Sequence, residues 1–111
     1  MSIVKDHPAQ TLGALNATAA VTTEDADEIS ISVTGTWVGT ITFQVSNDNE
    51  TWFDITLYKS DEVDKKSATK STTSNGLFYH PTGAFKQVRA RMTSYTSGSA
   101  SIKYVTTRFG V

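Results

Sequence analysis

Apolar and polar side chains alternate along much of this chain. Residues 29–34, 41–46 and 88–93 each place an apolar side chain at every second position, with Ser, Thr, Gln or Arg between. Because successive side chains of a β-strand point to opposite faces of a sheet, each run predicts a strand with one buried and one polar face. No apolar helical repeat persists for several turns, so a substantial helix is not expected.

Residues that favour turns separate these runs. Residues 35–39, 47–50 and 96–99 are rich in Gly, Asn, Asp, Ser and Thr. Such residues tolerate the backbone conformations of tight turns, so the pattern predicts hairpins at 35–39 and 96–99 and a further turn at 47–50. Short strands separated by turns are typical of sandwiches and barrels, and we predict an all-β fold, an antiparallel β-sandwich of about eight strands with jelly-roll or immunoglobulin-like topology.

The apolar phase of the strands predicts the core. Side chains that share the buried face should pack into one continuous cluster. The predicted members are Ile31, Val33, Ile41, Phe43, Val88, Ala90, Met92 and Ile102.

The first residues look different from the rest. Residues 1–16 contain Pro8, Gly13 and only scattered apolar side chains. A segment with so little apolar surface cannot offset its own ordering entropy, so we expect an extended N-terminal arm at 1–16 that is ordered by another subunit, followed by a β-sandwich domain at 17–111.

Two strands carry large side chains on both faces. Residues 51–58 place Phe53, Ile55 and Leu57 on one face, and Trp52, Asp54, Thr56 and Tyr58 on the other. The last strand places Ile102 and Tyr104 opposite Val105 and Phe109. A sheet needs only one face for its own core, so the large apolar side chains on the second face predict a homo-oligomer, with a trimer as the first expectation. The alternative is a bulge near Thr106 that turns Phe109 inward and leaves a monomer.

Composition narrows the function classes. The 111 residues carry a formal net charge of −1, with a pI near 6.0, so no strong field attracts nucleic acid or an anionic membrane surface. The chain has no cysteine and no continuous apolar run. We therefore expect synthesis in the cytoplasm without an export signal, and no partnership with nucleic acid or membrane.

Catalytic and metal chemistry find little support in the sequence. His7 and His80 have no local Ser or carboxylate partners of the kind that general base catalysis needs, so we expect no enzyme and no cofactor. The acidic runs at 24–28 and 47–50 offer oxygen ligands for calcium, but they lack the glycine-pivoted spacing of a dedicated loop. Solvated turns are the favoured interpretation, without a metal.

Six residues are candidates for contacts with other molecules. Aromatic side chains can form a platform for sugar rings, or they can be buried in the core or at a subunit interface. Arginines on the outer face of one strand could contact acidic side chains of a partner protein, or they could be solvated. The candidates are Trp37, Trp52, Tyr58, Arg89, Arg91 and Phe109. Trp37, between two glycines, is expected to be the most exposed.

Five blocks of sequence, in their order and spacing, carry a resemblance. They are TGTWVGTITF at 34–43, SND at 46–48 before TW at 51–52, NGLFY at 75–79, GAFKQVRAR at 83–91 and YTSGSA at 95–100. Together they resemble a small β-sandwich module of tailed-bacteriophage virion structural proteins, over about residues 17–108. This module occurs in capsid decoration proteins, fibres and baseplates.

The resemblance implies a virion component made in the host cytoplasm and brings no catalytic residues with it. Because only an arm precedes the module and no fibre shaft follows it, we expect a capsid decoration or cement subunit that contacts a major capsid or tail protein. A tail or baseplate component is an alternative within the same resemblance. The alternative from another class is a carbohydrate-binding adhesion module.

Overall fold

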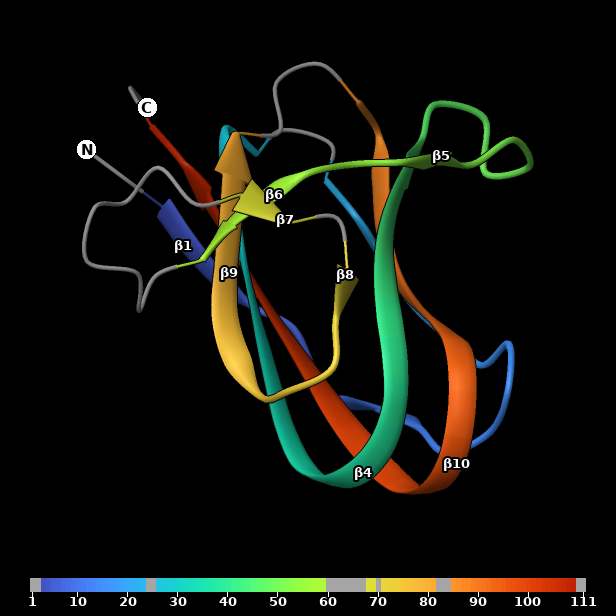
Figure 1. The fold of residues 1–111 in the computed structure, drawn as a ribbon. Coiled ribbons are helices and arrows are strands. Elements are labelled where there is room, and N and C mark those ends of the chain that lie inside the picture. Colours follow the sequence, from blue (N-terminus) through green and yellow to red (C-terminus); the bar gives the residue numbers. More distant parts are fainter. Residues whose placement is uncertain (1–2, 24–25, 60–67, 70, 82–84, 110–111) are drawn as a thin grey trace.

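The computed structural model describes residues 3–23, 26–59, 68–69, 71–81 and 85–109. These residues form ten β-strands (Figure 1). The strands are β1 Ile3–Asp6, β2 Gln10–Leu12, β3 Thr18–Thr22, β4 Glu28–Ser46, β5 Phe53–Asp54, β6 Leu57–Lys59, β7 Ala68–Thr69, β8 Ser71–Thr72, β9 Gly76–Pro81 and β10 Gln87–Arg108. The described residues contain no helix that could span a lipid bilayer.

Two long strands organise the sheet. The 19-residue β4 and the 22-residue β10 pair antiparallel from Glu28↔Thr107 to Ser46↔Gln87. Figure 1 shows both strands running down one side of the molecule, bending together at the bottom and rising on the other side. The result is a two-stranded ribbon folded over on itself.

The shorter strands extend this ribbon at both sides. β9 pairs with the first half of β4, and β8 and β5 pair with its second half. β3 pairs with the first half of β10, and β2 and β1 pair with its second half. β6 joins β9, and β7 joins β6. Each half of the ribbon is therefore the centre of a wider sheet.

The hairpins predicted at 35–39 and 96–99 are wrong, because β4 and β10 run through both segments without a break. The turn residues bend the paired strands instead of ending them. The register shifts between Met92 and Ser94 and again between Tyr95 and Ser97, as it does at β-bulges. Gly98 adopts a φ of +82°, and a Cβ there would lie 2.2 Å from the carbonyl oxygen of Thr36, so the bend requires a residue without a side chain.

The all-β, antiparallel character of the fold is confirmed. The predicted sandwich is not, because the strands form one continuously hydrogen-bonded sheet, with order β1-β10-β4-β9-β6-β7 and four strands beside this path. A jelly-roll or immunoglobulin-like topology needs two sheets that are joined only by connections. Here β4 and β10 each run through both halves of the molecule and join them into one sheet. The sandwich topology therefore stays a prediction.

The predicted core is confirmed. All eight residues of the predicted cluster are at most 1% exposed. They lie in one cluster with further buried side chains, among them Leu12, Ile29, Phe78 and Tyr104. The rings of Phe43 and Phe78 pack at a centroid distance of 5.0 Å. The core therefore fills the space between the two halves of the folded ribbon.

Tyr104 connects the two halves of the folded ribbon through hydrogen bonds. Its ring lies in the core, and its hydroxyl donates a hydrogen bond to the carbonyl oxygen of Ala19. The hydroxyl oxygen of Tyr104 also accepts the N–H of Ala90 at 3.1 Å. Burial raises the pKa of Tyr104 well above its usual range. Tyr104 lies in the second half of β10. Its side chain therefore bonds to the backbone of the first half of β10 and to the backbone of β3.

The expectation that residues 1–16 form no strand with their own domain is wrong. β1 and β2 both pair with β10, and Leu12 is fully buried in the core. The length of β10 explains this, because its second half offers a free edge whose hydrogen bonds order the segment without a large apolar surface. Leu12 then supplies a single anchor to the core.

The single strand expected at 51–58 is also wrong. The chain forms β5 beside β4 and then β6 beside β9, and residues 55–56 between them belong to neither strand. Leu57 is buried, but Phe53, expected on the same face, is 64% exposed. Short strands with different partners need not share a face.

Candidate interaction surface

Arg89 is at the centre of a polar network on the outer face of the half-sheet that β3, β10, β4 and β5 form. Its guanidinium carbon lies 4.2 Å from the centroid of the Trp52 ring. Its Nε–H donates to Oε1 of Gln44 at 2.8 Å, and the amide of Gln44 donates to Oδ1 of Asp54 at 3.0 Å. The cation is therefore held in one position between an aromatic face and an amide.

Arg91 extends this face toward β3. Its guanidinium donates to Oδ1 of Asn16 at 2.8 Å. Asn16 adopts a left-handed φ of 66°, and its N–H donates to the carbonyl of Met92. Burial, and secondly the charge of Arg91, lower the pKa of Arg89. Two cations thus lie on the same face of β10, and each donates to an acceptor of a neighbouring segment.

A rigid turn places Trp52 over Arg89. Oδ1 of Asp48 accepts the N–H groups of Glu50 and Thr51 at 2.9 and 2.8 Å, and the Ser46 hydroxyl donates to it at 3.0 Å. These hydrogen bonds lower the pKa of Asp48 to about 2. The turn predicted at 47–50 is confirmed, and it directs the chain so that Trp52 meets β10. We name Trp52, Arg89 and Arg91 the cationic face.

Trp37 does not lie in an exposed turn. It belongs to β4 at the bend, its indole packs against the core, and its Nε1–H donates to Oδ1 of Asn75 at 2.8 Å. The strand continues where the sequence pattern indicated a turn, so Trp37 is partly buried. Its role as a contact residue stays a prediction.

Tyr58 lies on the outer face of the other half-sheet. It is 39% exposed, with its ring centroid 5.6 Å from that of Tyr79 and 6.0 Å from that of His80. The cross-strand pair of Tyr58 with Tyr79 explains this small aromatic group. It is separate from the cationic face.

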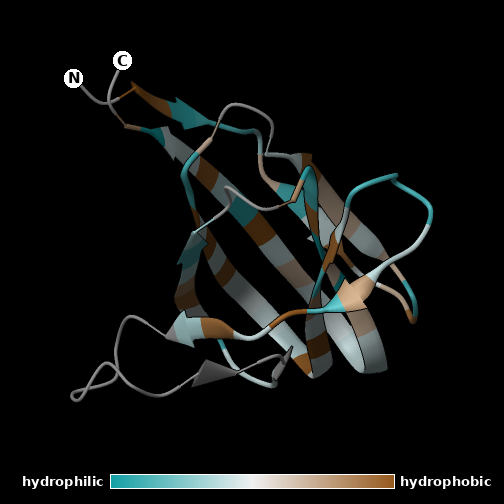
Figure 2. Cartoon of the chain, turned by 90° about the horizontal axis from the view of Figure 1, so that it is seen from above, coloured by the Kyte–Doolittle hydropathy of each residue, from teal (hydrophilic) through white to brown (hydrophobic). Residues whose placement is uncertain are grey.

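Phe109 belongs to a third place, the tip where β1 begins and β10 ends. Ile3, Val4 and Phe109 are 49%, 64% and 50% exposed. They lie at the same end of the molecule, because Ile3 pairs with Arg108, the residue before Phe109, but Ile3 and Val4 point to opposite faces of β1. Figure 2 shows hydrophobic colour near both termini, which lie close to each other. The register of β10 with β4 is regular at Thr106, so the alternative bulge that would turn Phe109 inward is absent. We name Ile3, Val4 and Phe109 the apolar tip.

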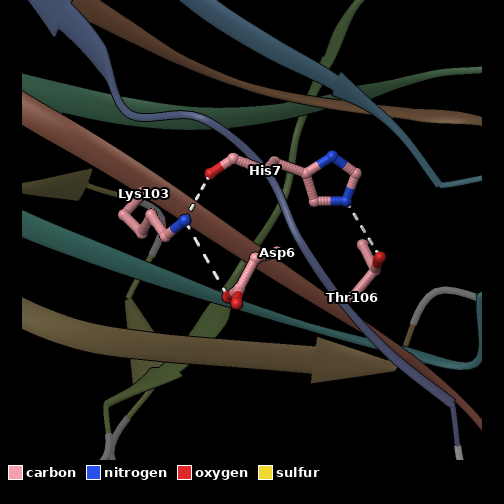
Figure 3. Close-up of polar contacts among 4 residues, drawn as sticks. All are labelled: Asp6, His7, Lys103 and Thr106. Atoms are coloured by element: carbon pink, nitrogen blue, oxygen red, sulfur yellow. Dashed lines mark hydrogen bonds and ion pairs between the residues drawn. The ribbon is translucent and has the colours of Figure 1, made fainter.

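His7, which the sequence analysis placed in a free arm, lies in a structured groove. Its Nε2 is 3.0 Å from the hydroxyl of Thr106, and Nζ of Lys103 donates to its backbone carbonyl at 2.6 Å (Figure 3). The same Nζ is 3.8 Å from Oδ1 of Asp6. Burial and the charges of Lys5 and Lys103 lower the pKa of His7, and Asp6 opposes them. The pairing of β1 with β10 creates this arrangement, and the sequence spacing gave no signal for it.

The groove beside His7 has a volume of about 670 Å³. Its lining combines β3 with the segment from β1 to β2, namely Lys5, His7, Pro8, Gln10, Ala20, Val21, Thr22 and Thr106. In the described part of the chain, His7 has no carboxylate as a hydrogen-bond partner.

Metal ligands are not gathered among the described residues, where no group of three His, Asp or Glu side chains could hold an ion. Glu24 and Asp25, part of the acidic run considered for calcium, lie outside the described residues. In the other acidic run, the hydrogen bonds within the turn engage Asp48. The Asp48 side chain accepts hydrogen bonds from backbone N–H groups of its own turn.

Two solved structures resemble the whole fold. The SPBc2 prophage-derived protein YomS superposes with a TM-score of 0.75 at 14% identity, over 96% of this chain and 93% of YomS. The PBSX exported protein XepA gives a TM-score of 0.72 at 18% identity, over 93% of this chain but 39% of XepA. At these identities the likeness shows the fold alone.

No protein-family model matches the sequence. No curated protein matches it either.

Proposed function

We propose that this chain is a structural protein of a phage particle, and most specifically a decoration or cement subunit of the capsid. The observation that carries the proposal is the agreement of its whole fold with a prophage-derived protein of nearly the same extent, at a TM-score of 0.75. The sequence blocks that resemble virion modules support the same class independently. The role involves binding without catalysis and without a cofactor.

Two surfaces support a role in assembly. The apolar tip exposes three large side chains at one end of the molecule, and such a patch gains free energy when a second protein covers it. The cationic face presents arginines that are held in fixed positions, which lowers the entropy lost on contact with acidic side chains. One surface suits self-association, and the other suits a capsid or tail protein.

The mechanism is binding energy alone. A subunit that binds only the assembled lattice favours the lattice over its separated parts by mass action. If copies associate through the apolar tip, each assembly attaches at several points, and the attachments reinforce one another. A trimer would suit a lattice site of threefold symmetry.

Counting copies per particle tests the proposal. Quantitative mass spectrometry of purified particles should find this chain in hundreds of copies, as expected for a protein distributed over a capsid. A handful of copies would instead indicate a tail or baseplate component. Absence from purified particles would contradict a virion role altogether.

The alternative from another class is a glycan-binding adhesion module, which the exposed Tyr58 and its neighbour Tyr79 favour. Trp52 suits a sugar platform less well, because Arg89 covers one face of its ring. A glycan array that shows specific binding, lost in Tyr58→Ala but kept in Phe53→Ala, would favour this alternative. No binding on the array would leave the decoration role as the proposal.

A further inference from the structure

We propose that β1 is exchanged between copies of this chain, so that β1 of one copy pairs with β10 of its neighbour. The inference rests on the self-association part of the proposed function. It identifies the second copy as the partner, β1 as the exchanged element and the edge of β10 at residues 105–108 as its receptor.

β1 is attached to its own domain by little besides hydrogen bonds. All four side chains of Ile3–Asp6 are exposed, and the strand pairs with β10 alone at the end of the sheet. Leu12, six residues further along, is fully buried and fixes the following segment. Moving β1 to another copy therefore uncovers no core.

The partners of β1 all belong to β10 itself. The register joins Ile3–Asp6 to residues 105–108. The adjoining His7 bonds to the backbone of Tyr104 at 3.1 Å and to Thr106, and it accepts from Lys103. A β1–His7 segment supplied by a neighbour makes the same contacts with the same groups. The free-energy difference between the two arrangements thus depends on the hinge and on protein concentration.

The hinge is suited to the exchange. Pro8 and Ala9 lie outside the strands and are exposed. Proline fixes its own φ and disfavours a helical conformation of the preceding residue, so the chain before it is held extended. An extended hinge directs β1 away from the body as readily as it lays β1 back along it.

The apolar tip favours a second copy over an unrelated strand. Ile3 and Val4 lie on opposite faces of β1, and Phe109 follows β10, so a β1 strand supplied by a neighbour brings exposed apolar side chains to the end of the receiving β10. In the exchanged arrangement, the bodies of two copies are brought together at this patch. The exposed side chains of both then cover one another.

Engineered cysteines test the exchange directly, because the chain contains none of its own. Val4 lies opposite Thr107 across the β1–β10 pair, and directly paired residues of antiparallel strands come close enough for a disulfide. Val4→Cys and Thr107→Cys copies of the full chain are co-expressed with different tags, purified through both tags and mildly oxidised. We expect a disulfide-linked product that carries both tags on a non-reducing gel.

The matched control uses the other side of β10. Thr107 also lies opposite Glu28 of β4, which is part of the long ribbon and cannot leave it. Glu28→Cys co-expressed with Thr107→Cys should give no product that carries both tags. A product in both pairs, or in neither, would overturn the exchange. If light scattering finds an oligomer but the Val4→Cys and Thr107→Cys pair gives no product, the protein self-associates without exchanging β1. If light scattering finds a monomer, both the self-association and the exchange are wrong.

Discussion

At the scale of single residues, the hydroxyl of Tyr104 connects segments that are far apart in the sequence. The alternation placed Tyr104 on the same face as Ile102, and both are buried. Its partners could not be predicted, because they are backbone groups of Ala19 and Ala90 that meet it only after β10 has bent. Side-chain phase is a local property, whereas a bond across the core depends on the path of the whole ribbon.

Removing this hydroxyl should destabilise the fold without changing its shape. In Tyr104→Phe, a buried N–H and a buried carbonyl lose a partner, and we expect a cost of about 1–3 kcal/mol in the free energy of unfolding, measured by urea denaturation. Tyr95→Phe is the control, because its hydroxyl bonds to the carbonyl of Gly98 in an exposed position. Equal effects in the two variants would contradict a special role for Tyr104.

His7 should make stability depend on pH. Its pKa in the folded state is lowered from 6.5, so the unfolded chain binds more protons than the folded chain in the window below that value. Stability therefore falls as the pH drops through this window and recovers as the pH rises. Urea denaturation between about pH 7.5 and pH 5 should show this loss in the parent chain, and a smaller one in His7→Gln. Identical pH profiles would argue against the burial of His7 beside Lys5 and Lys103.

At the scale of elements, the alternation predicted most strand segments but not their continuity. The buried apolar positions of β4 are odd-numbered on both sides of the bend, from Ile29 to Val33 and from Ile41 to Phe43. Those of β10 are even-numbered on both sides. This unbroken parity was the signal of continuous strands. The glycine-rich bends concealed it, because bulges and hairpin turns use the same residues.

The glycine at the bend of β10 should resist substitution. Gly98→Ala places a side chain on a left-handed residue, at a cost of about 1–3 kcal/mol. The overlap of its Cβ with the backbone of Thr36 adds to this. Thermal unfolding followed by circular dichroism measures the loss. Gly13→Ala, whose Cβ would meet its nearest atom at 3.7 Å, should be nearly neutral; similar losses would refute the strain at Gly98.

The N-terminal segment should divide into a dispensable and an essential part. Deleting residues 1–6 removes exposed side chains and a short strand, so a small change in melting temperature is expected. Leu12→Ala leaves a cavity in the core and should cost about 2–5 kcal/mol. Differential scanning calorimetry of both variants and the parent chain measures the changes in melting temperature. A deletion as damaging as Leu12→Ala would show that β1 is part of the cooperative core.

At the scale of the whole molecule, the candidate residues do not form one site. Strand alternation placed Arg89 and Arg91 on one outer face, whereas nothing in the sequence linked Trp52 to them. The structure brings them together and adds Gln44 and Asp54. Such a grouping depends on strand register, which local patterns leave open. Tyr58 and Phe109 lie elsewhere, and Trp37 packs against the core.

Self-association is the property on which the assembly role depends. The apolar tip remains exposed in a single copy, so we expect multi-angle light scattering at tens of micromolar to give a multiple of the 12.0 kDa chain mass, with a trimer as the first expectation. Val4→Asp should shift the mass toward a monomer, whereas Phe53→Asp, an exposed change away from the tip, should not. A monomeric parent chain would remove the argument for multivalent attachment.

The length of β10 has a consequence for biosynthesis. The strand comes last of the ten along the chain, yet β1, β2, β3 and β4 all pair with it. During translation these four strands emerge before their common partner exists, and most contacts of the fold join residues distant in sequence. Folding must therefore wait until residues 87–108 have left the ribosome. Until then, the edge and apolar face of β4 stay uncovered and exposed to aggregation or to chaperones.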